Sequence, residues 1–587
     1  MAPKYIDPVR TGVIGAIAVF PLSIVLVNIL WRTPKRCYAQ VCPELATYKD
    51  LNLITTYVFY AFLVYMAILL KIAQRNHWSQ TAITLGGKPR ITLTSFLVLI
   101  SMIAHHSFHF AYYWTEVVAR RATYPANYMD WLNVLFRVAG RMMALQLGLQ
   151  FIPTARDGFL NGYLGLDFDK GLQFHRWSGT FLMLWILFHG IGQELPQGVR
   201  NGPQKYWLGL TGQSSTSPLA YTKYVRLTGM LAALMLLWVG INSLPIVRRK
   251  KYGWFRANHF FALTGFVMAC VHASPILYFA LPGLLTYLID SIVRRYNRRH
   301  AYKITNITVE KCGYLRVDIE GPRFRYKPGQ WAYLNVPAVR NLSWHPFSIA
   351  SSPHSYDDTI VIPNAPDTPD SVRKQKLVVD ESASHYVQNN ASASPITFII
   401  KPTTSSASWT SNLLKAWQRR PANSPGLKVF IDGPHGTAPK KFFDSDRVIC
   451  VAGGSGIPGA VGIARSILDY NLLDRNEEEA RQHVRLCWSV RDEASALSSF
   501  SLLNELHGHH LAASHLQTHL HSSLAERLNV KGYLELEART WKEEKVKTVS
   551  VYVCGPKNLI KEASVAAFEL AKKEGVVIRV HTEGYAR

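Results

Sequence analysis

The chain has 587 residues and a formal net charge of +26, and 48% of its residues are hydrophobic. This length predicts two or three domains. Much of the positive charge lies in short clusters beside apolar segments, in residues 247–256 and 291–300, which is typical of the cytosolic ends of membrane helices. The charge therefore indicates a lipid bilayer as a partner and argues against nucleic acid.

Eight apolar segments before residue 297 have the length of a membrane helix. They cover residues 11–31, 52–72, 91–112, 131–152, 173–193, 223–244, 257–274 and 276–294. An even number places both ends of the chain on one side, and the basic clusters assign that side to the cytosol. We expect the first segment to remain as a membrane helix, because no small-residue cleavage site accompanies it. Cys37 and Cys42 share an outward loop on this topology, where they could be bridged or remain thiols.

Two of these segments each contain two histidines, His175 and His189 in the fifth and His259 and His272 in the seventh. Their spacings of 14 and 13 residues correspond to roughly 20 Å along a helix. Both helices run outward from the cytosol on this topology, so the histidines form an inner and an outer level. Ionisable groups at membrane depth are costly and mostly functional, so this pattern predicts two stacked haems with one histidine from each helix. The shorter spacing turns His272 away from the face of His259, and we expect a distortion near Gly265.

Other polar residues of the apolar segments leave two interpretations open. Arg137 and Arg141 lie on one face of the fourth segment and could bind haem propionates or pair with a polar loop. His105, His106 and His109, near the outer end of the third segment, could bind a metal ion outside or pack as core residues.

A β-rich pattern begins at residue 301. Residues 301–321 alternate and are rich in β-branched side chains, and residues 325–337 contain a turn followed by another alternating stretch, which predicts strands of a barrel. Residues 344–353, which read WHPFSIASSP, come next. Residues 364–395 are polar and low in aromatics, which predicts a disordered insertion. Residues 396–417 predict a strand, a Ser-rich loop and the start of a helix.

A third region opens at residues 447–470 with an apolar strand, a glycine-rich turn and a helix. Glycines allow the backbone to approach a pyrophosphate, and the N–H groups of a helix start bind it. Two more strands, in residues 484–495 and 549–559, also end in turns, and such turns meet at the ligand-binding edge of a doubly wound sheet. The histidine-rich residues 505–523 predict a helix end followed by a strand with alternating histidines, in preference to a metal site.

Six motifs then occur in a specific order: His-x13-His, His-x12-His, HPFS (345–348), GPHG (433–436), GGSGI (453–457) and CGP (554–556). Over residues 131–587 the chain resembles the ferric reductases and NADPH oxidases, a superfamily of transmembrane flavocytochromes. The resemblance is strongest to the fungal-type ferric-chelate reductases. It implies a multi-domain fold with an α-helical transmembrane haem bundle (1–298), an antiparallel β-barrel FAD domain (299–440) and a ferredoxin-reductase-like, α/β doubly wound NADP-binding domain (441–587).

The resemblance also implies a role for each matching residue. His175 and His259 would ligate an inner haem b, and His189 and His272 an outer haem b. The flavin would contact His345, Pro346, Phe347 and Ser348, with a looser match at Lys401, Trp409 and Thr410 and a closing turn at Gly433, Pro434 and Gly436. The phosphates of NADPH would bind Gly453, Gly454, Ser455, Gly456 and Ile457, and its nicotinamide would face Cys554, Gly555 and Pro556. Arg491 would bind the 2′-phosphate of NADPH, although the carboxylate of the adjacent Asp492 disfavours a phosphate there. Arg141 would bind a haem propionate. Tyr585 could cover the flavin.

The function implied is a ferric-chelate reductase, with cupric ions as a further substrate. Electrons would pass from NADPH through FAD and the two haems to an acceptor outside. The alternative is an NADPH oxidase that makes superoxide. Those oxidases typically repeat a histidine four residues after the outer ligand, where this chain has Gln193, and two extra N-terminal helices are common in fungal-type ferric reductases.

A haem-bearing scaffold or sensor without turnover is a third class, which the intact HPFS, GGSGI and CGP motifs disfavour. The resemblance implies a multi-pass protein of the plasma membrane, with the vacuolar membrane as the alternative. The FAD and NADP domains would lie in the cytosol. Ferric chelates would bind at the outer face, and an iron permease and oxidase uptake system would be the partner.

Overall fold

The structure is a computed structural model of the chain. It describes residues 8–32, 43–76, 78, 82–85, 88–119, 125, 127–155, 164, 168–211, 220–321, 324–341, 343–353, 395–403, 408–421, 423–436, 442–473, 482–491, 500–524 and 526–584. The predictions for Cys37 and Cys42, for residues 364–394, for Asp492 and for Tyr585 lie outside these residues. The chain divides into a helical unit within residues 6–296 and a sheet unit within residues 297–585.

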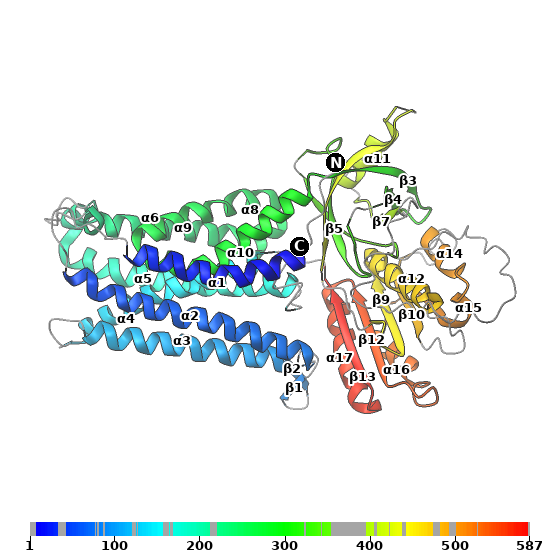
Figure 1. Cartoon of the computed structure of the whole chain (residues 1–587), viewed down its shortest axis with the longest axis horizontal. Coiled ribbons are helices and arrows are strands. Elements are labelled where there is room, and N and C mark those ends of the chain that lie inside the picture. Colours follow the sequence, from blue (N-terminus) through cyan, green and yellow to red (C-terminus); the bar gives the residue numbers. More distant parts are fainter. Residues whose placement is uncertain are drawn as a thin grey trace. The chain divides into compact units, whose positions relative to one another are not determined.

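The helical unit is a bundle of long helices (Figure 1). Its elements are α1 (Pro8–Arg32), α2 (Pro43–Arg75), the hairpin β1 (Ala82–Leu85) and β2 (Lys88–Thr92), α3 (Leu93–Ala119), α4 (Tyr128–Phe151), a 3₁₀ turn (Ile152–Thr154), α5 (Phe168–Leu210), α6 (Ala220–Asn242), α7 (Pro245–Lys250), α8 (Tyr252–His259), α9 (Phe261–His272) and α10 (Pro275–Asn297). Each predicted apolar segment falls mainly on helix, but residues 91 and 92 belong to β2, residues 243 and 244 follow α6, and the seventh segment is divided between α8 and α9.

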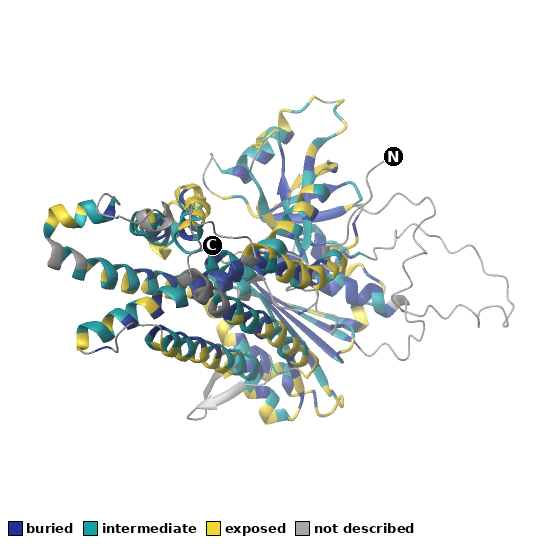
Figure 2. Ribbon diagram, turned by 60° about the vertical axis from the view of Figure 1, so that its left-hand side comes forward, coloured by how far each residue is buried: buried dark blue, intermediate teal, exposed yellow. Residues whose placement is uncertain are grey.

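Among the described residues, five helices are long and apolar enough to cross a membrane: α1, α2, α3, α6 and α10. Charged residues occur along α4 and α5, and α9 has 12 residues, so eight spans remain a prediction. Large apolar side chains on the long helices are exposed, such as Ile17 at 70% and Leu99 at 53%, and Figure 2 shows exposed residues along the helices. Hydrocarbon chains of a bilayer would cover such residues.

The segment that carries His259 and His272 is irregular at Phe260. The Phe260 N–H donates to Ala257 over 3.4 Å, and the Leu263 N–H donates to Phe260 over 3.1 Å. These bonds span three residues, as in a 3₁₀ helix, which rotates the following residues further around the axis than an α-helix does. The predicted distortion is therefore present at Phe260 rather than near Gly265, which lies inside regular α9.

The sheet unit begins with an antiparallel barrel, as predicted. Its strands are β3 (Ala301–Val309), β4 (Leu315–Ile319), β5 (Trp331–Asn335), β6 (His345–Ser348), β7 (Ile396–Ile400) and β8 (Leu427–His435), in the order β6-β5-β8-β3-β4-β7. All pairings are antiparallel, and a bridge between Ile349 and Phe398 connects the two ends of this order. Helix α11 (Trp409–Gln418) packs its apolar face against the barrel core.

A buried ion pair stabilises the end of β8. Asp432 is 1% exposed and pairs with Arg298 and, over 3.6 Å, with His435. Burial alone would raise the pKa of Asp432, but the charges of His435 and Arg298 hold that pKa well below its ordinary value. A carboxylate with a depressed folded pKa stabilises the fold above its unfolded pKa, and this contribution is lost as the pH falls.

We expect Asp432→Asn to lower the free energy of unfolding of the sheet unit by about 3 kcal/mol at pH 7, because two cationic groups lose their buried partner. Thermal unfolding of the purified protein at a series of pH values measures this. The difference from the parent should shrink below about pH 4, where the carboxyl of Asp432 becomes protonated in the unfolded chain while it stays ionised in the folded parent. A difference that is constant from pH 7 to pH 3 would contradict the assignment.

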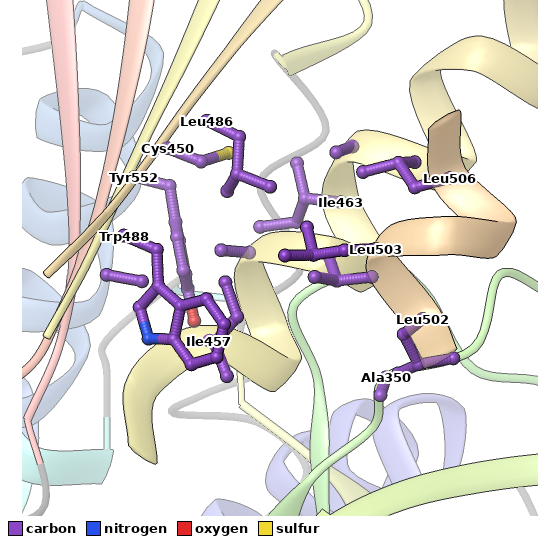
Figure 3. Close-up of a cluster of buried hydrophobic side chains, with 14 of the residues drawn as sticks. Ala350, Cys450, Ile457, Ile463, Leu486, Trp488, Leu502, Leu503, Leu506 and Tyr552 are labelled. Atoms are coloured by element: carbon purple, nitrogen blue, oxygen red, sulfur yellow. The ribbon is translucent and has the colours of Figure 1, made fainter. Parts of the chain in front are cut away.

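The second part of the sheet unit is a parallel sheet in the order β11-β10-β9-β12-β13. The strands are β9 (Arg447–Gly453), β10 (His483–Val490), β11 (Leu516–Ser522), β12 (Thr548–Cys554) and β13 (Val577–Glu583). Helices α12 (Ile457–Leu473) and α14 (Ser501–His507) pack on one face, and α16 (Val530–Ala538) and α17 (Lys557–Glu574) pack on the other. Figure 3 shows the first of these cores, with Trp488 and Tyr552 beside Ile457. The predicted doubly wound fold is confirmed.

The histidine-rich stretch also has the predicted elements. Helix α14 ends at His507, a short helix α15 (Ala512–His515) follows, and β11 carries His519 and His521 two residues apart. His519 stacks on Tyr533 with ring centroids 5.5 Å apart. These histidines therefore take part in packing of the α/β lobe.

Candidate functional site

The helical unit brings the four predicted histidines together in two pairs. The ring centroids of His175 and His259 are 6.1 Å apart, and those of His189 and His272 are 6.5 Å apart. One ring of each pair comes from α5, and the other is the last residue of α8 or of α9. A metal ion held at about 2 Å by one nitrogen of each ring would separate the ring centres by roughly 6 Å. Both pairs have the spacing of a bis-histidine metal site.

Hydrogen bonds define the metal-binding nitrogen of the outer pair. Nδ1 of His189 lies 2.7 Å from the carbonyl oxygen of Phe136, and Nδ1 of His272 lies 2.8 Å from that of Val225. A carbonyl oxygen only accepts, so Nδ1 donates in both rings and the lone pair is on Nε2. Such bonds orient histidines that ligate metals.

Two glycines make room for the outer rings. A Cβ on Gly140 of α4 would lie 2.6 Å from His189, and a Cβ on Gly229 of α6 would lie 2.7 Å from His272. Any side chain at these positions would displace the rings, because a packed interior has little space to absorb such a contact. Helices α4 and α6 therefore each approach one histidine of the outer pair.

Side chains from α4 and from the residue after α6 lie beside the inner pair. Nε2 of Gln150 in α4 lies 2.9 Å from Nδ1 of His175, and Oγ of Ser243, which follows α6, lies 3.3 Å from Nδ1 of His259. The Oε1 atom of Gln150 is buried without a hydrogen-bond partner in the described part of the chain. With two matched ring pairs, oriented imidazoles and the glycine spaces, these residues fit two bis-histidine haems.

Arg141 interacts with the helices that precede α4. Its Nη1 lies 3.4 Å from Oδ1 of Asn52, and its guanidinium carbon lies 5.6 Å from the centre of the Tyr113 ring. These contacts pair a half-buried cation with polar and aromatic groups of α2 and α3. Its assignment to a haem propionate stays a prediction.

The histidine cluster of α3 packs inside the bundle. His105 stacks on Phe62 with centroids 3.9 Å apart, and His109 is fully buried with Nε2 3.2 Å from the carbonyl of Thr55. His106 lies 3.2 Å from Gln146 of α4. Of the two interpretations of this cluster, the contacts favour core residues that connect α2, α3 and α4.

The HPFS motif forms β6 and lies against Trp409 of α11. The ring of Trp409 stacks on His345 and Phe347 with centroid distances of 4.6 and 5.7 Å. Its indole N–H is buried and has no acceptor in the described residues, although buried indole N–H groups usually have one. This leaves a hydrogen-bond donor for a bound group beside the aromatic surface, so the residues fit the flavin of FAD.

The remaining predicted flavin residues are spread around the barrel. Ser348 is 4% exposed. A Cβ on Gly433 of β8 would lie 2.8 Å from Cβ of Ala332, so the two strands approach closely at this glycine. Thr410 accepts the Thr403 N–H over 3.2 Å, and the ammonium of Lys401 lies 5.7 Å from the ring of Tyr314. Their roles in binding FAD remain predictions.

The glycine-rich turn connects β9 to α12 through a 3₁₀ turn at Gly454–Gly456. Gly454 has a φ of 53°, and no atom of the described residues lies within 4 Å of its absent Cβ, so a ligand can approach the backbone there. A Cβ on Gly456 would lie 2.4 Å from the carbonyl oxygen of Cys554. The turn therefore rests directly on the CGP strand, and the residues fit a dinucleotide phosphate at the start of α12.

Helix α12 also contacts the flavin motif. A Cβ on Gly462 would lie 2.9 Å from the carbonyl oxygen of Ile349, which follows Ser348, and Figure 3 shows Ala350 in the same core as α12. The glycine turn thus touches Cys554, and the helix that follows it touches the residue after HPFS. Hydride transfer requires its two partners to be held in such proximity.

The other predicted dinucleotide residues lie at the same edge of the sheet. Arg491 follows β10, the strand beside β9, and is exposed. A Cβ on Gly555 would lie 3.3 Å from Cα of Gly453, and Pro556 is the N-cap of α17. Ser455 belongs to the 3₁₀ turn.

Two residues of this site were not predicted. The indole N–H of Trp488 donates to the carbonyl of Gly454 over 2.9 Å and fixes the glycine turn. Glu583 pairs in register with Cys554 and accepts a hydrogen bond from Tyr552. Glu583 had a weak signal, a carboxylate at the end of the last strand, whereas nothing in the sequence marked Trp488.

Three family models match the chain in the same order. A ferric reductase like transmembrane component matches residues 139–289, an FAD-binding domain matches residues 299–439, and a ferric reductase NAD binding domain matches residues 445–527. These matches and the fold define a membrane flavoprotein with FAD- and NAD-binding domains and a transmembrane component of a type that binds haem. The chain belongs to the superfamily of ferric reductases and NADPH oxidases.

Relatives of both kinds are similar to the chain. Ferric reduction oxidase 3, mitochondrial, of Arabidopsis thaliana is 24% identical over 329 residues, which cover 55% of this chain and 38% of the relative. NADPH oxidase 5 of Homo sapiens is 25% identical over 376 residues, which cover 58% of this chain and 46% of the relative. The chain spans about two fifths of the Arabidopsis relative.

A ferredoxin-NADP+ reductase from Plasmodium falciparum with 2'P-AMP is similar at 17% identity. The match covers 49% of this chain and 95% of that chain, with a TM-score of 0.32.

Proposed function

We propose that this chain is a transmembrane ferric-chelate reductase that moves electrons from NADPH, through FAD and two haems, to an acceptor on the other side of the membrane. The observation that carries the proposal is the presence of two histidine pairs, with centroids 6.1 and 6.5 Å apart, in the same chain as FAD- and NAD-binding domains. Bound FAD accepts electrons in pairs and releases them singly, and haem carries one electron at a time.

Each motif has one task in this proposal. The turn Gly453–Gly456 would bind the phosphates of NADPH at the start of α12, and Cys554, Gly555 and Pro556 would face the nicotinamide. His345, Phe347 and Trp409 hold the flavin from the barrel side. His175 with His259 and His189 with His272 would hold the two haems, with two histidines at each, and haem held in this way would supply electron transfer rather than bond-making at iron.

The acceptor is a ferric chelate, with cupric ions as a further substrate. Gln193 lies one turn beyond His189 at the position where the oxidases typically have a further histidine, and the Nε2 of Gln193 is buried without an acceptor among the described residues. Helices α1 and α2 are two N-terminal helices of the kind common in fungal-type ferric reductases. Several similar proteins are named ferric reduction oxidases.

The test of the acceptor is NADPH-driven reduction of a ferric chelate in membranes that contain the protein, with and without superoxide dismutase. The proposal expects chelate reduction that dismutase does not change. Strong inhibition by dismutase would assign the chain to the oxidases that make superoxide, which several relatives are named for.

The wider assignment follows from the same proposal. The haem domain comprises residues 1–298, the FAD domain residues 299–440 and the NADP domain residues 441–587. The protein resides in the plasma membrane, with the sheet unit in the cytosol, and supplies reduced iron to a permease and oxidase uptake system. Location of a tagged chain and the accessibility of tags at its two ends test this part.

Arg491 sets the preference for NADPH over NADH, because a guanidinium binds a phosphate with charge-assisted hydrogen bonds. We expect Arg491→Ala to lower kcat/KM for NADPH by about 10- to 100-fold, which corresponds to the loss of one such contact. The value for NADH should change little. Steady-state dye reduction with both nucleotides measures the two constants, and an equal loss for both would contradict the role.

A further inference from the structure

Two hexapeptides that flank the inner haem site share one pattern. Residues 238–243 read WVGINS at the end of α6, and residues 254–259 read WFRANH at the end of α8. Each has a tryptophan, then an asparagine four residues later, then one further residue. The last residue of the second hexapeptide is His259, the inner histidine of the α8–α9 segment.

The two hexapeptides hold each other through reciprocal hydrogen bonds. The indole N–H of Trp238 donates to Oδ1 of Asn258 over 2.8 Å, and the indole N–H of Trp254 donates to Oδ1 of Asn242 over 2.7 Å. Each asparagine then donates its Nδ2 to the carbonyl of the tryptophan in its own hexapeptide, over 2.9 Å in both cases. We call these four residues the Trp–Asn clasp.

The clasp is a specific connection between α6 and α8. Asn242 and Asn258 are each 6% exposed, and buried amides are retained only where their polar atoms are paired. Trp238 and Trp254 are about half exposed, at 47% and 54%, so their rings lie at the edge of the contact. Geometry of this kind fixes both the rotation and the axial position of α8, because a shift of either helix breaks two bonds at once.

The residues that follow the two asparagines meet each other. Oγ of Ser243 donates to the carbonyl of Val239 over 2.7 Å, so its contact of 3.3 Å with His259 leaves the hydroxyl as acceptor and Nδ1 of His259 as donor. This arrangement directs Nε2 of His259 away from Ser243, toward the position between His259 and His175.

His259 differs from the other three histidines in what orients it. Nδ1 of His175, of His189 and of His272 each lies within hydrogen-bond distance of a backbone carbonyl. His259 instead donates to the hydroxyl of Ser243, which the clasp holds beside it. We infer that the Trp–Asn clasp and Ser243 are the positioning device of the inner haem ligand His259, and that Ser243 tunes the inner haem without touching the outer one. This inference rests on the proposed function, since it concerns the haem that function requires.

The first test uses Ser243→Ala, with Ser243→Thr as the conservative variant and Thr286→Ala as the matched control. Thr286 also donates its hydroxyl to the carbonyl four residues earlier, over 2.7 Å, but on α10. Potentiometric titration of the purified holoprotein resolves the two haems. Loss of the acceptor makes the imidazole a weaker donor to iron, so Ser243→Ala should raise the midpoint of one haem, by about tenfold in its reduction equilibrium, or roughly 59 mV for one electron. Ser243→Thr and Thr286→Ala should keep both parental midpoints.

The second test uses Asn258→Ala and the haem content of the purified protein. Loss of the clasp should reduce the content from two haems per chain to one and remove the low-spin signal of the inner haem from the EPR spectrum, while the outer signal stays. If Asn258→Ala does not accumulate, the midpoint potentials of Ser243→Ala test the inference. Parental midpoints in Ser243→Ala, or a shift of both haems together, would overturn the inference and leave the proposed function intact. A parent protein that binds no haem would overturn both.

Discussion

His189→Ala is expected to abolish reduction of a membrane-impermeant ferric chelate and to leave NADPH-dependent reduction of a soluble dye unchanged. His189 supplies one side of the outer pair, whose rings lie 6.5 Å apart, and alanine leaves a metal there with a single histidine. Mutation of a residue that hydrogen-bonds to a metal ligand typically lowers metal affinity or activity by 10- to 100-fold, and loss of the ligand itself lowers it further. We therefore expect the rate of chelate reduction to fall by more than about 100-fold. The dye accepts electrons from the sheet unit, which this change does not touch.

The control is His510→Ala, an exposed histidine of the α/β lobe. This variant should keep both activities. Reduction of the chelate at the parental rate by His189→Ala would show that electrons do not pass the outer pair, and the relay would be wrong.

Gly456→Ala is expected to abolish both activities, because it blocks the entry of electrons. The added methyl group would lie 2.4 Å from the carbonyl oxygen and 3.0 Å from the sulfur of Cys554. The nearest of these atoms is backbone, so the glycine turn itself must move away from the end of β12. We expect kcat/KM for NADPH to fall by more than about 100-fold, since misplacement by 1 Å at such a site already has that effect.

The matched control is Gly575→Asn in the same lobe. Gly575 ends α17 with a φ of 67°, and in the described part of the chain no atom lies within 4 Å of its absent Cβ. Asparagine tolerates such a position. Gly575→Asn should retain dye reduction, and in Gly456→Ala dithionite should still reduce the haems fully. Dye reduction at the parental rate in Gly456→Ala would exclude the glycine turn as the NADPH site.

Elements with strong local patterns were predictable from the sequence. The strand, turn and helix of residues 447–470 have apolar periodicity, glycines and Pro458 in one order, and each signal favours the same structure. The four histidines were predictable because ionisable groups in apolar segments are rare. The position of the distortion was not, because the 3₁₀ bonds at Phe260 depend on how α8 is held against α6.

Residues that act through tertiary contacts were missed. Ser243 and Trp488 belong to no motif in the sequence. Ser243 contacts His259, 16 residues away, and Trp488 donates to the carbonyl of Gly454, 34 residues away. Trp409 was only a loose match, although its ring lies on His345 and Phe347. Gly462 had no visible signal, because the carbonyl that excludes a side chain there belongs to Ile349 in another lobe. Such pairings require the folded chain.

Anaerobic reduction of the purified protein by NADPH, followed by visible spectroscopy, measures electron transfer from NADPH to the haems directly. We expect two low-spin haems per chain, both reduced by NADPH and both reoxidised when an impermeant ferric chelate is added. A protein that contains FAD but purifies without haem, or whose haems stay oxidised in the presence of NADPH, would contradict this expectation.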